Sequence, residues 1–252
     1  KLKGLVDELD HVGFTPIIDV LYEAAKYYRG ESVDWGKQRG FSNSSVSACS
    51  DPPHLCNGNS FTNDLVRKNT RISHEASWTG GTVNRPTGCT DANLNALECL
   101  GESISGSAVY TSPITEACQA NYIVLLTDGE PNNNDSVEKI TSEFGISCSG
   151  GTTDGDTCGE ELASFLNTED QIPGLSGDQG IVTYTIGFDF SDSFLTDLAL
   201  AGGGESFTAS TGAELANVFQ TIVTDILNRS TSFSTPTLSI NAFNKLEDLE
   251  DV

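Results

Sequence analysis

Four stretches of the chain show a regular pattern of hydrophobic and polar positions. Residues 122–126 and 181–188 are short, nearly unbroken apolar runs rich in β-branched and aromatic side chains. Such runs predict strands buried on both faces of a mostly parallel sheet, so the strand at 122–126 is expected mid-sheet. Residues 15–30 and 211–229 carry apolar side chains at helical spacing, which predicts two amphipathic helices. Strands that alternate with helices indicate an α/β fold with helices on both faces of a parallel sheet.

Both predicted helices carry recognisable start signals. Thr15 precedes Pro16, as an N-cap residue precedes a proline in the first helical position, and Gly30 ends the helix. Thr211 and Glu214 have the spacing of a capping box at the start of the second helix.

The remaining sequence sets the expected domain organisation. Residues 31–88 are polar and lack periodicity, with Trp78-Thr79-Gly80-Gly81 among the segments that interrupt regular structure. A stretch this long predicts a disulfide-pinned insertion or a functional surface loop. We expect one α/β domain over residues 1–230, followed by a linker and the first strand of another β domain over residues 231–252, where apolar and polar residues alternate.

The net charge of the chain argues against some classes of binding partner. The chain of 252 residues has 36 acidic and 13 basic side chains and a net charge of -23. This excess of negative charge argues against binding to nucleic acid or anionic lipid, both of which require Lys and Arg, and favours solubility and bound cations. The sequence shows no signal peptide or stop-transfer run and begins with Lys1 rather than Met, so we expect a processed or excised piece.

Seven cysteines lie between residues 49 and 158, and none forms a C-x-x-C pair. Their placement in polar, Gly-rich segments is typical of disulfides formed in an oxidising compartment rather than of a zinc site. Proximity favours the pairs Cys49–Cys56, Cys89–Cys99 and Cys148–Cys158, although sequence does not fix connectivity. Cys118 is then left without a partner in this pairing.

The strand at 122–126 leads directly into two acidic residues, Asp128 and Glu130. Ligands of open α/β sheets bind at the carboxyl ends of the strands. A carboxylate held there suits a hard divalent cation, which prefers oxygen ligands. The alternative interpretation is that Asp128 and Gly129 only begin a turn.

Several segments together resemble the von Willebrand factor A domain, and within that group the PilC/PilY family of type IV pilus assembly factors and tip adhesins. A Thr-Pro helix start, a strand ending in Thr-Asp-Gly-Glu and a later TYTIGF strand occur in the family's order. About three strands are apparent where ~5 to 6 are usual, so the first strand of the family fold is expected to be missing from this chain. The segments that carry the resemblance are FTPIIDVLYEAAKYYRG (14–30), RISHEASWTGG (71–81), YTSPITEACQANYIVLLTDGEPN (110–132) and TYTIGF (183–188) with the LALAGGGESFTASTGAELANVFQTIVTDIL segment that follows.

The resemblance implies a metal-ion-dependent adhesion site built from three loops. In the family, an Asp-x-Ser-x-Ser element is followed by a Thr and then by an Asp, and Thr15 and Asp128 match the last two. These residues would hold Mg²⁺, Mn²⁺ or Ca²⁺ directly or through water, with one position left for an acidic group of a partner. As an N-cap, Thr15 would need no metal. The string from Asp189 to Ser193 has the Asp-x-Ser-x-Ser form but follows a later strand, so we interpret Asp189 and Ser191 as caps of the next helix.

The functional hypothesis is a non-enzymatic adhesin and assembly factor at the pilus tip, exported through the periplasm to the cell surface. Its expected partners are the minor pilins at the pilus tip and a ligand on a host or abiotic surface, with no nucleic acid and no membrane span. One alternative is a metal-dependent hydrolase or phosphatase that uses Asp128, with Glu130 as the only local second carboxylate. Another alternative is a metal-free structural spacer.

Overall fold

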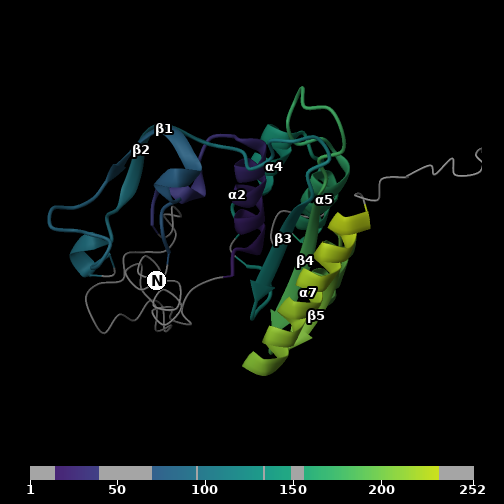
Figure 1. Cartoon of the computed structure of the whole chain (residues 1–252). Coiled ribbons are helices and arrows are strands. Elements are labelled where there is room, and N and C mark those ends of the chain that lie inside the picture. Colours follow the sequence, from purple (N-terminus) through teal and green to yellow (C-terminus); the bar gives the residue numbers. More distant parts are fainter. Residues whose placement is uncertain (1–14, 40–69, 95, 133, 149–155, 233–252) are drawn as a thin grey trace, which may run out of the picture.

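The computed structural model describes residues 15–39, 70–94, 96–132, 134–148 and 156–232. Within them the chain is a mixed α/β protein with a three-stranded parallel sheet flanked by helices and a separate two-stranded sheet (Figure 1). The α/β prediction is therefore confirmed.

The parallel sheet holds the strands on which the candidate site depends. It consists of β3 (Asn121–Thr127), β4 (Ile181–Phe188) and β5 (Gly203–Ala209), in the order β3-β4-β5. β3 and β4 pair without interruption over the full length of β3, whereas the β4–β5 pairing has one register shift. Because the strands are parallel, their carboxyl ends lie at one edge of the sheet.

Helices cover both faces of this sheet. On one face α2 (Ile17–Arg29), α4 (Val137–Phe144), α5 (Asp156–Thr168) and α6 (Ser193–Ala201) contribute to one hydrophobic core that also contains Leu125 of β3. On the other face α7 (Gly212–Ser232) packs through Ile222 against Tyr184 and Ile186 of β4. The amphipathic pattern of the first and last helices explains this arrangement, because each buries one apolar face against the sheet.

The strand β3 corrects one expectation. It lies at the end of the described sheet instead of mid-sheet, and only one of its faces is well covered. Leu125 is buried against the helices, whereas Val124 and Leu126 on the opposite face are 38% and 48% exposed. The apolar run was predicted to be buried on both faces of the sheet. Among the described residues, α7 does not cover these two side chains.

The second sheet corrects another expectation. Residues 78–84, within the stretch expected to be irregular, form strand β1 (Trp78–Asn84), which pairs antiparallel with β2 (Ser103–Tyr110). Short 3₁₀ helices η1 (Trp35–Lys37), η2 (Glu75–Ser77) and η3 (Leu97–Cys99) accompany them. This strand was not predicted because Gly80-Gly81 normally interrupts regular structure. In the structure the strand continues through the glycines, since Gly80 has a positive φ and the pairing register shifts beside it.

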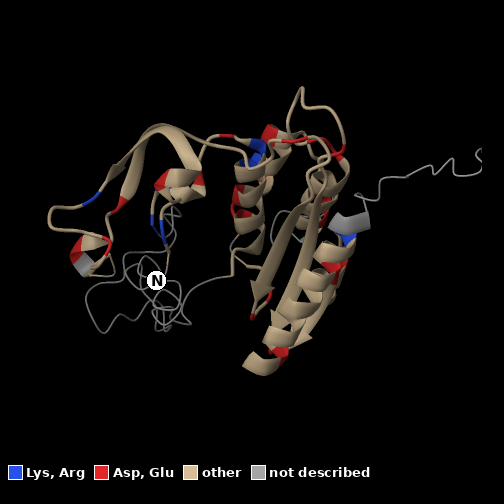
Figure 2. Cartoon of the chain, in the orientation of Figure 1, with Lys and Arg blue, Asp and Glu red and all other residues tan. Residues whose placement is uncertain are grey.

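The predicted disulfides Cys89–Cys99 and Cys148–Cys158 are present, and Cys118 is an exposed free thiol. Cys49 and Cys56 lie outside the described residues, as does the predicted β segment from residue 233 onward. No helix in the described part of the chain is long and apolar enough to cross a membrane. Acidic side chains are spread over most described elements, and basic ones are few (Figure 2).

Candidate functional site

The two residues predicted to hold a metal ion lie together at the carboxyl end of β3. The Thr15 hydroxyl oxygen is 3.5 Å from the position that a Cβ atom would take on Gly129, the residue after Asp128. Asp128 is exposed and Thr15 is partly buried. Segments more than a hundred residues apart in sequence therefore meet at one rim of the sheet.

The turn that carries Asp128 is fixed by its neighbours. The Thr127 hydroxyl donates a hydrogen bond to the Gly129 carbonyl at 2.9 Å and accepts one from the Gly129 amide at 3.2 Å. Thr127 is buried while Asp128 and Glu130 on either side of Gly129 are exposed. The carboxylates therefore point to water from a turn whose backbone is held by a buried hydroxyl.

Two asparagines clamp the start of α2 to the loop after β3. The Asn132 side chain accepts a hydrogen bond from the Thr15 amide at 2.9 Å, and the Asn134 side chain accepts one from the Ile18 amide at 3.1 Å. The first amides of a helix lack partners within the helix, so Asn134 satisfies one of them from a distant segment, while Asn132 holds the backbone just before the helix. This role was not predicted from the sequence, because an Asn-rich run after a strand is typical of a solvated loop.

Thr15 does not act as the expected helix cap. Helix α2 begins at Ile17, Pro16 occupies the cap position, and no side chain there makes a capping hydrogen bond. The backbone carbonyl of Thr15 accepts from the amides of Ile17 and Asn132. The Asn134 side chain accepts from the Ile18 amide instead, so the N-cap interpretation of Thr15 is wrong and the Thr15 hydroxyl is not used for capping.

Asp19, in the first turn of α2, is a further residue at this junction that the sequence did not single out. Its two carboxylate oxygens accept hydrogen bonds from the Asp135 amide at 2.9 and 3.2 Å. Burial raises the pKa of the Asp19 carboxyl above its ordinary value, and hydrogen bonds from Ser136 and Asp135 oppose that shift. The carboxylate faces protein donors and not the exposed rim, so its role is to position the loop.

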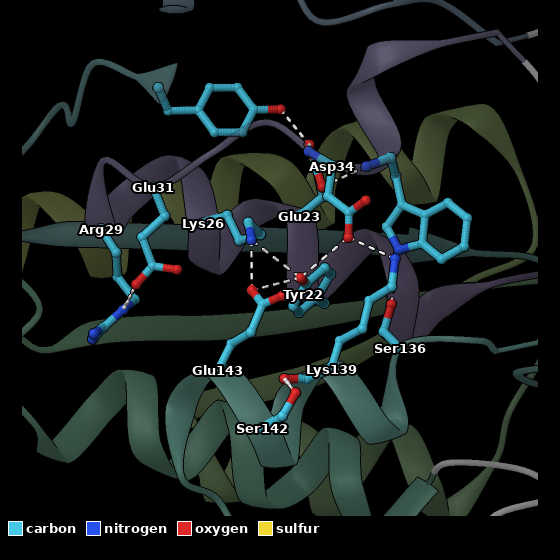
Figure 3. Close-up of polar contacts among 12 residues, drawn as sticks. Tyr22, Glu23, Lys26, Arg29, Glu31, Asp34, Ser136, Lys139, Ser142 and Glu143 are labelled. Atoms are coloured by element: carbon cyan, nitrogen blue, oxygen red, sulfur yellow. Dashed lines mark hydrogen bonds and ion pairs between the residues drawn. The ribbon is translucent and has the colours of Figure 1, made fainter. Parts of the chain in front are cut away.

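Beneath the rim, a network of charged and hydroxyl side chains joins α2, α4 and η1 (Figure 3). Lys26, almost fully buried, contacts Glu143 at 2.5 Å and the Tyr22 hydroxyl at 3.2 Å. The Tyr22 hydroxyl donates to Glu143 at 2.8 Å, and burial together with this acidic partner raises the pKa of Tyr22. Across the same space Lys139 pairs with Asp34 at 2.6 Å.

Glu23 extends the network to the second sheet. Its carboxylate accepts hydrogen bonds from the backbone amides of Asp34, Trp35 and Gly36 at 3.1, 2.9 and 3.1 Å. It also accepts one from the Tyr110 hydroxyl of β2 at 2.6 Å. One side chain of α2 therefore anchors both η1 and the end of β2, which fixes the helix that presents Thr15.

The Asp-x-Ser-x-Ser string after β4 has a different geometry from the one expected. Asp192 is the N-cap of α6 and accepts from the Phe194 amide at 2.7 Å, so the assignment of the cap to Asp189 and Ser191 is wrong. Asp189 has a positive φ of 51°, and its amide donates to the Ala209 carbonyl at 2.7 Å. It follows β4 at the same sheet edge, because Thr127 and Gly187 are paired in register.

The donor chemistry of the rim fits a hard divalent cation. A threonine hydroxyl and a carboxylate are oxygen ligands, and Mg²⁺ commonly binds through one or two carboxylates while keeping several waters. Within the described residues, no three His, Cys, Asp or Glu side chains are grouped to hold a metal ion. Thr15 and Asp128 are the residues predicted to hold such an ion at this rim, with water completing its coordination.

We compared the chain with known proteins by sequence and by structure. No family model, no curated protein and no solved structure matches the chain.

Proposed function

We propose that the chain is a von Willebrand factor A-like module of a PilC/PilY-type pilus adhesin and assembly factor, and that it acts by binding and not by catalysis. The observation that supports the proposal is the approach of the Thr15 hydroxyl to Gly129, the residue after Asp128, at the carboxyl edge of the parallel sheet. The order of the resembling segments supports the family assignment, and the net charge of -23 supports a cation-dependent mode of binding.

In the proposed mode, the Asp128 carboxylate and the Thr15 hydroxyl hold Mg²⁺, Mn²⁺ or Ca²⁺ at the rim. The bound ion supplies an open coordination position for an acidic group of a partner. The chain's own residues hold the two ligands in place, since Asn132 fixes Thr15 and Thr127 fixes the turn at Asp128. Two protein ligands give weak binding, with a dissociation constant on the order of millimolar.

The test replaces the carboxylate by its isosteric amide in a bacterium that displays this protein with its type IV pili. Asp128→Asn is expected to reduce surface attachment and the number of assembled pili while export of the protein stays unchanged. Asp189→Asn is the matched control, because Asp189 also lies at this edge of the sheet but does not belong to the proposed pair. Equal attachment and piliation in the parent and Asp128→Asn strains would contradict the proposal.

The same variants separate the alternatives. Turnover of p-nitrophenyl phosphate by the purified chain with Mg²⁺, abolished in Asp128→Asn, would replace the proposal with a metal-dependent phosphatase. Normal attachment in Asp128→Asn, together with no Mg²⁺ or Ca²⁺ binding by calorimetry, would indicate a metal-free structural spacer.

A further inference from the structure

A polar groove lies between helix α7 and strand β5. Its volume is about 520 Å³, within the ~300 to 1,000 Å³ typical of small-molecule sites. In Figure 1 α7 lies against β4 and β5. We call this hollow the α7–β5 groove, and its lining includes Glu205 and Phe207 of β5 and Asn217, Gln220, Thr221 and Thr224 of α7.

The helix side of the groove presents hydrogen-bonding groups that the protein leaves unused. Its four residues recur at i, i+3, i+4 and i+7 and therefore share one face of α7. Within the part of the chain that the structure describes, the side-chain amides of Asn217 and Gln220 make no hydrogen bond, so each offers two donor hydrogens and one acceptor oxygen. The Thr221 and Thr224 hydroxyls donate to the helix carbonyls of Asn217 and Gln220 at 3.0 and 2.7 Å, and their oxygens can still accept.

Two carboxylates border the groove, and only one of them is already neutralised. Asp225 accepts hydrogen bonds from the Tyr184 hydroxyl and, at 2.8 Å, from the Arg229 guanidinium. Glu205 is exposed and forms no ion pair with any described residue. An anionic ligand would be repelled by this carboxylate and by the net charge of -23, so the groove favours a neutral ligand.

Phe207 supplies the apolar part of the lining. Its side chain is partly buried and packs with Tyr184 and Ile222 between the sheet and α7. An aromatic ring among amides and hydroxyls suits a ligand that has an apolar face and a hydroxyl-rich edge. A sugar ring has this form, since its C–H groups gather on one face and its hydroxyls surround it.

We propose that the α7–β5 groove binds a neutral sugar unit of a glycan. The C–H face of the sugar would lie on Phe207, and adjacent hydroxyls would exchange hydrogen bonds with Asn217 and Gln220, because hydroxyls and amides both donate and accept. An apolar ligand fits less well, since it would cover these amides without giving them partners. The inference does not rest on the metal site, so binding is expected to persist in EDTA and in Asp128→Asn.

The test screens the labelled full chain, in EDTA, on an array of neutral and sialylated glycans from host and microbial sources. Neutral glycans should be retained and their sialylated counterparts should not, and the retained spots show whether the source is a host surface or a microbial polysaccharide. Asn217→Ala and Gln220→Ala should each weaken binding of the best neutral glycan by about fivefold, as expected for one lost hydrogen bond. Both variants should fold, because alanine favours the helix.

Gln38→Ala is the matched control, since Gln38 is an exposed glutamine at the end of η1, and this change should leave binding unchanged. Glu205→Gln should keep sugar binding, because the amide still accepts a hydrogen bond without carrying charge. A polylysine peptide that binds the parent chain but not Glu205→Gln, with no neutral glycan bound, would assign the groove to a cationic ligand instead.

The proposal would be overturned if no neutral glycan bound a chain that is folded by circular dichroism. It would also be overturned if binding survived in the double variant Asn217→Ala/Gln220→Ala, because the glycan would then lie elsewhere. Loss of glycan binding in EDTA and in Asp128→Asn would assign the glycan to the metal site. Failure of the metal site alone would leave glycan binding intact, so the two proposals fail separately.

Discussion

Thr15 and Asn132 hold each other through a reciprocal pair of hydrogen bonds. The Thr15 amide donates to the Asn132 side chain at 2.9 Å, and the Asn132 amide donates to the Thr15 carbonyl at 2.9 Å. This pair joins the start of α2 to the loop after β3. It places the Thr15 hydroxyl beside Gly129, where the proposed ion would bind.

Asn132→Ala should loosen this junction. Loss of the side-chain acceptor removes one hydrogen bond and is expected to cost about 1 kcal/mol, which lowers the melting temperature by ~2 to 4 °C in a protein of this size. Asn84→Ala is the control, because the Asn84 side chain makes only a local 3.4 Å contact to Thr82. Differential scanning fluorimetry checks the difference, and equal melting temperatures would show that the pair does not fix Thr15.

The Lys26–Glu143 pair, in which Lys26 is buried, should matter more for stability than pairs of exposed charges do. Lys26 is 4% and Glu143 38% exposed, so Lys26→Met leaves a partly screened carboxylate beside Tyr22. We expect a loss of about 2 kcal/mol, below the ~3 to 5 kcal/mol of fully buried pairs. Asp91, which is exposed and pairs with Arg85 at 2.9 Å, provides the comparison, and Asp91→Asn should change stability by less than ~1 kcal/mol. Urea unfolding of both variants measures their free energies of unfolding. Equal losses of stability in Lys26→Met and Asp91→Asn would contradict this prediction.

The pH dependence of stability should have opposite signs at two carboxyl groups. Burial raises the pKa of Asp19, so its favourable contribution is complete below the ordinary value of 3.8 and is lost as pH rises through the folded value. Hydrogen bonds from the Ser210 backbone and side chain lower the pKa of Glu214, so its contribution is present above 4.5 and is lost as pH falls.

Relative to Asp19→Asn, the parent protein should therefore become less stable between pH ~3 and pH ~7, and relative to Glu214→Gln it should become more stable. Urea unfolding at the two ends of this range measures both differences. The same sign for both carboxyl groups would contradict the environments described for them.

The disulfide Cys89–Cys99 should stabilise the segment between β1 and β2. It closes a loop with a sequence separation of 10 residues, for which loop-closure entropy gives about 3 kcal/mol. Replacing both cysteines by serine should lower the free energy of unfolding by up to this amount. Cys118→Ser removes only an exposed free thiol and is the control. No difference between these variants would mean that the bond does not restrain the unfolded chain.

Local patterns predicted β3 and β4 from their apolar runs, and α2 and α7 from the periodic apolar face that each helix buries. The same patterns did not predict sheet position, since the apolar run of β3 has no feature that marks it as a terminal strand in the described sheet. Strand β1 was not predicted because it contains Gly80-Gly81, where the pairing with β2 has a register shift. Its partner β2 is needed to make that segment regular, and a partner is not visible in local sequence.

The sequence singled out the two candidate ligands but not the residues that position them. Thr15 and Asp128 were singled out through the resemblance and the strand-end position, and their common location follows from long-range packing of α2. The positioning roles of Asn132, Asn134 and Asp19 depend on contacts across more than a hundred residues. Such contacts leave no periodic signal, so a polar loop residue and a structural acceptor look alike in sequence.

The most direct measurement is paramagnetic line broadening by Mn²⁺ in the ¹⁵N-labelled full chain. Binding at the rim predicts that the amide signals of Thr15 and Gly129 broaden first, and that Asp128→Asn removes this broadening while Asp189→Asn retains it. If Mn²⁺ broadens signals over the acidic surface without preference for these two amides, or broadens them equally in Asp128→Asn, then Thr15 and Asp128 do not form a metal site.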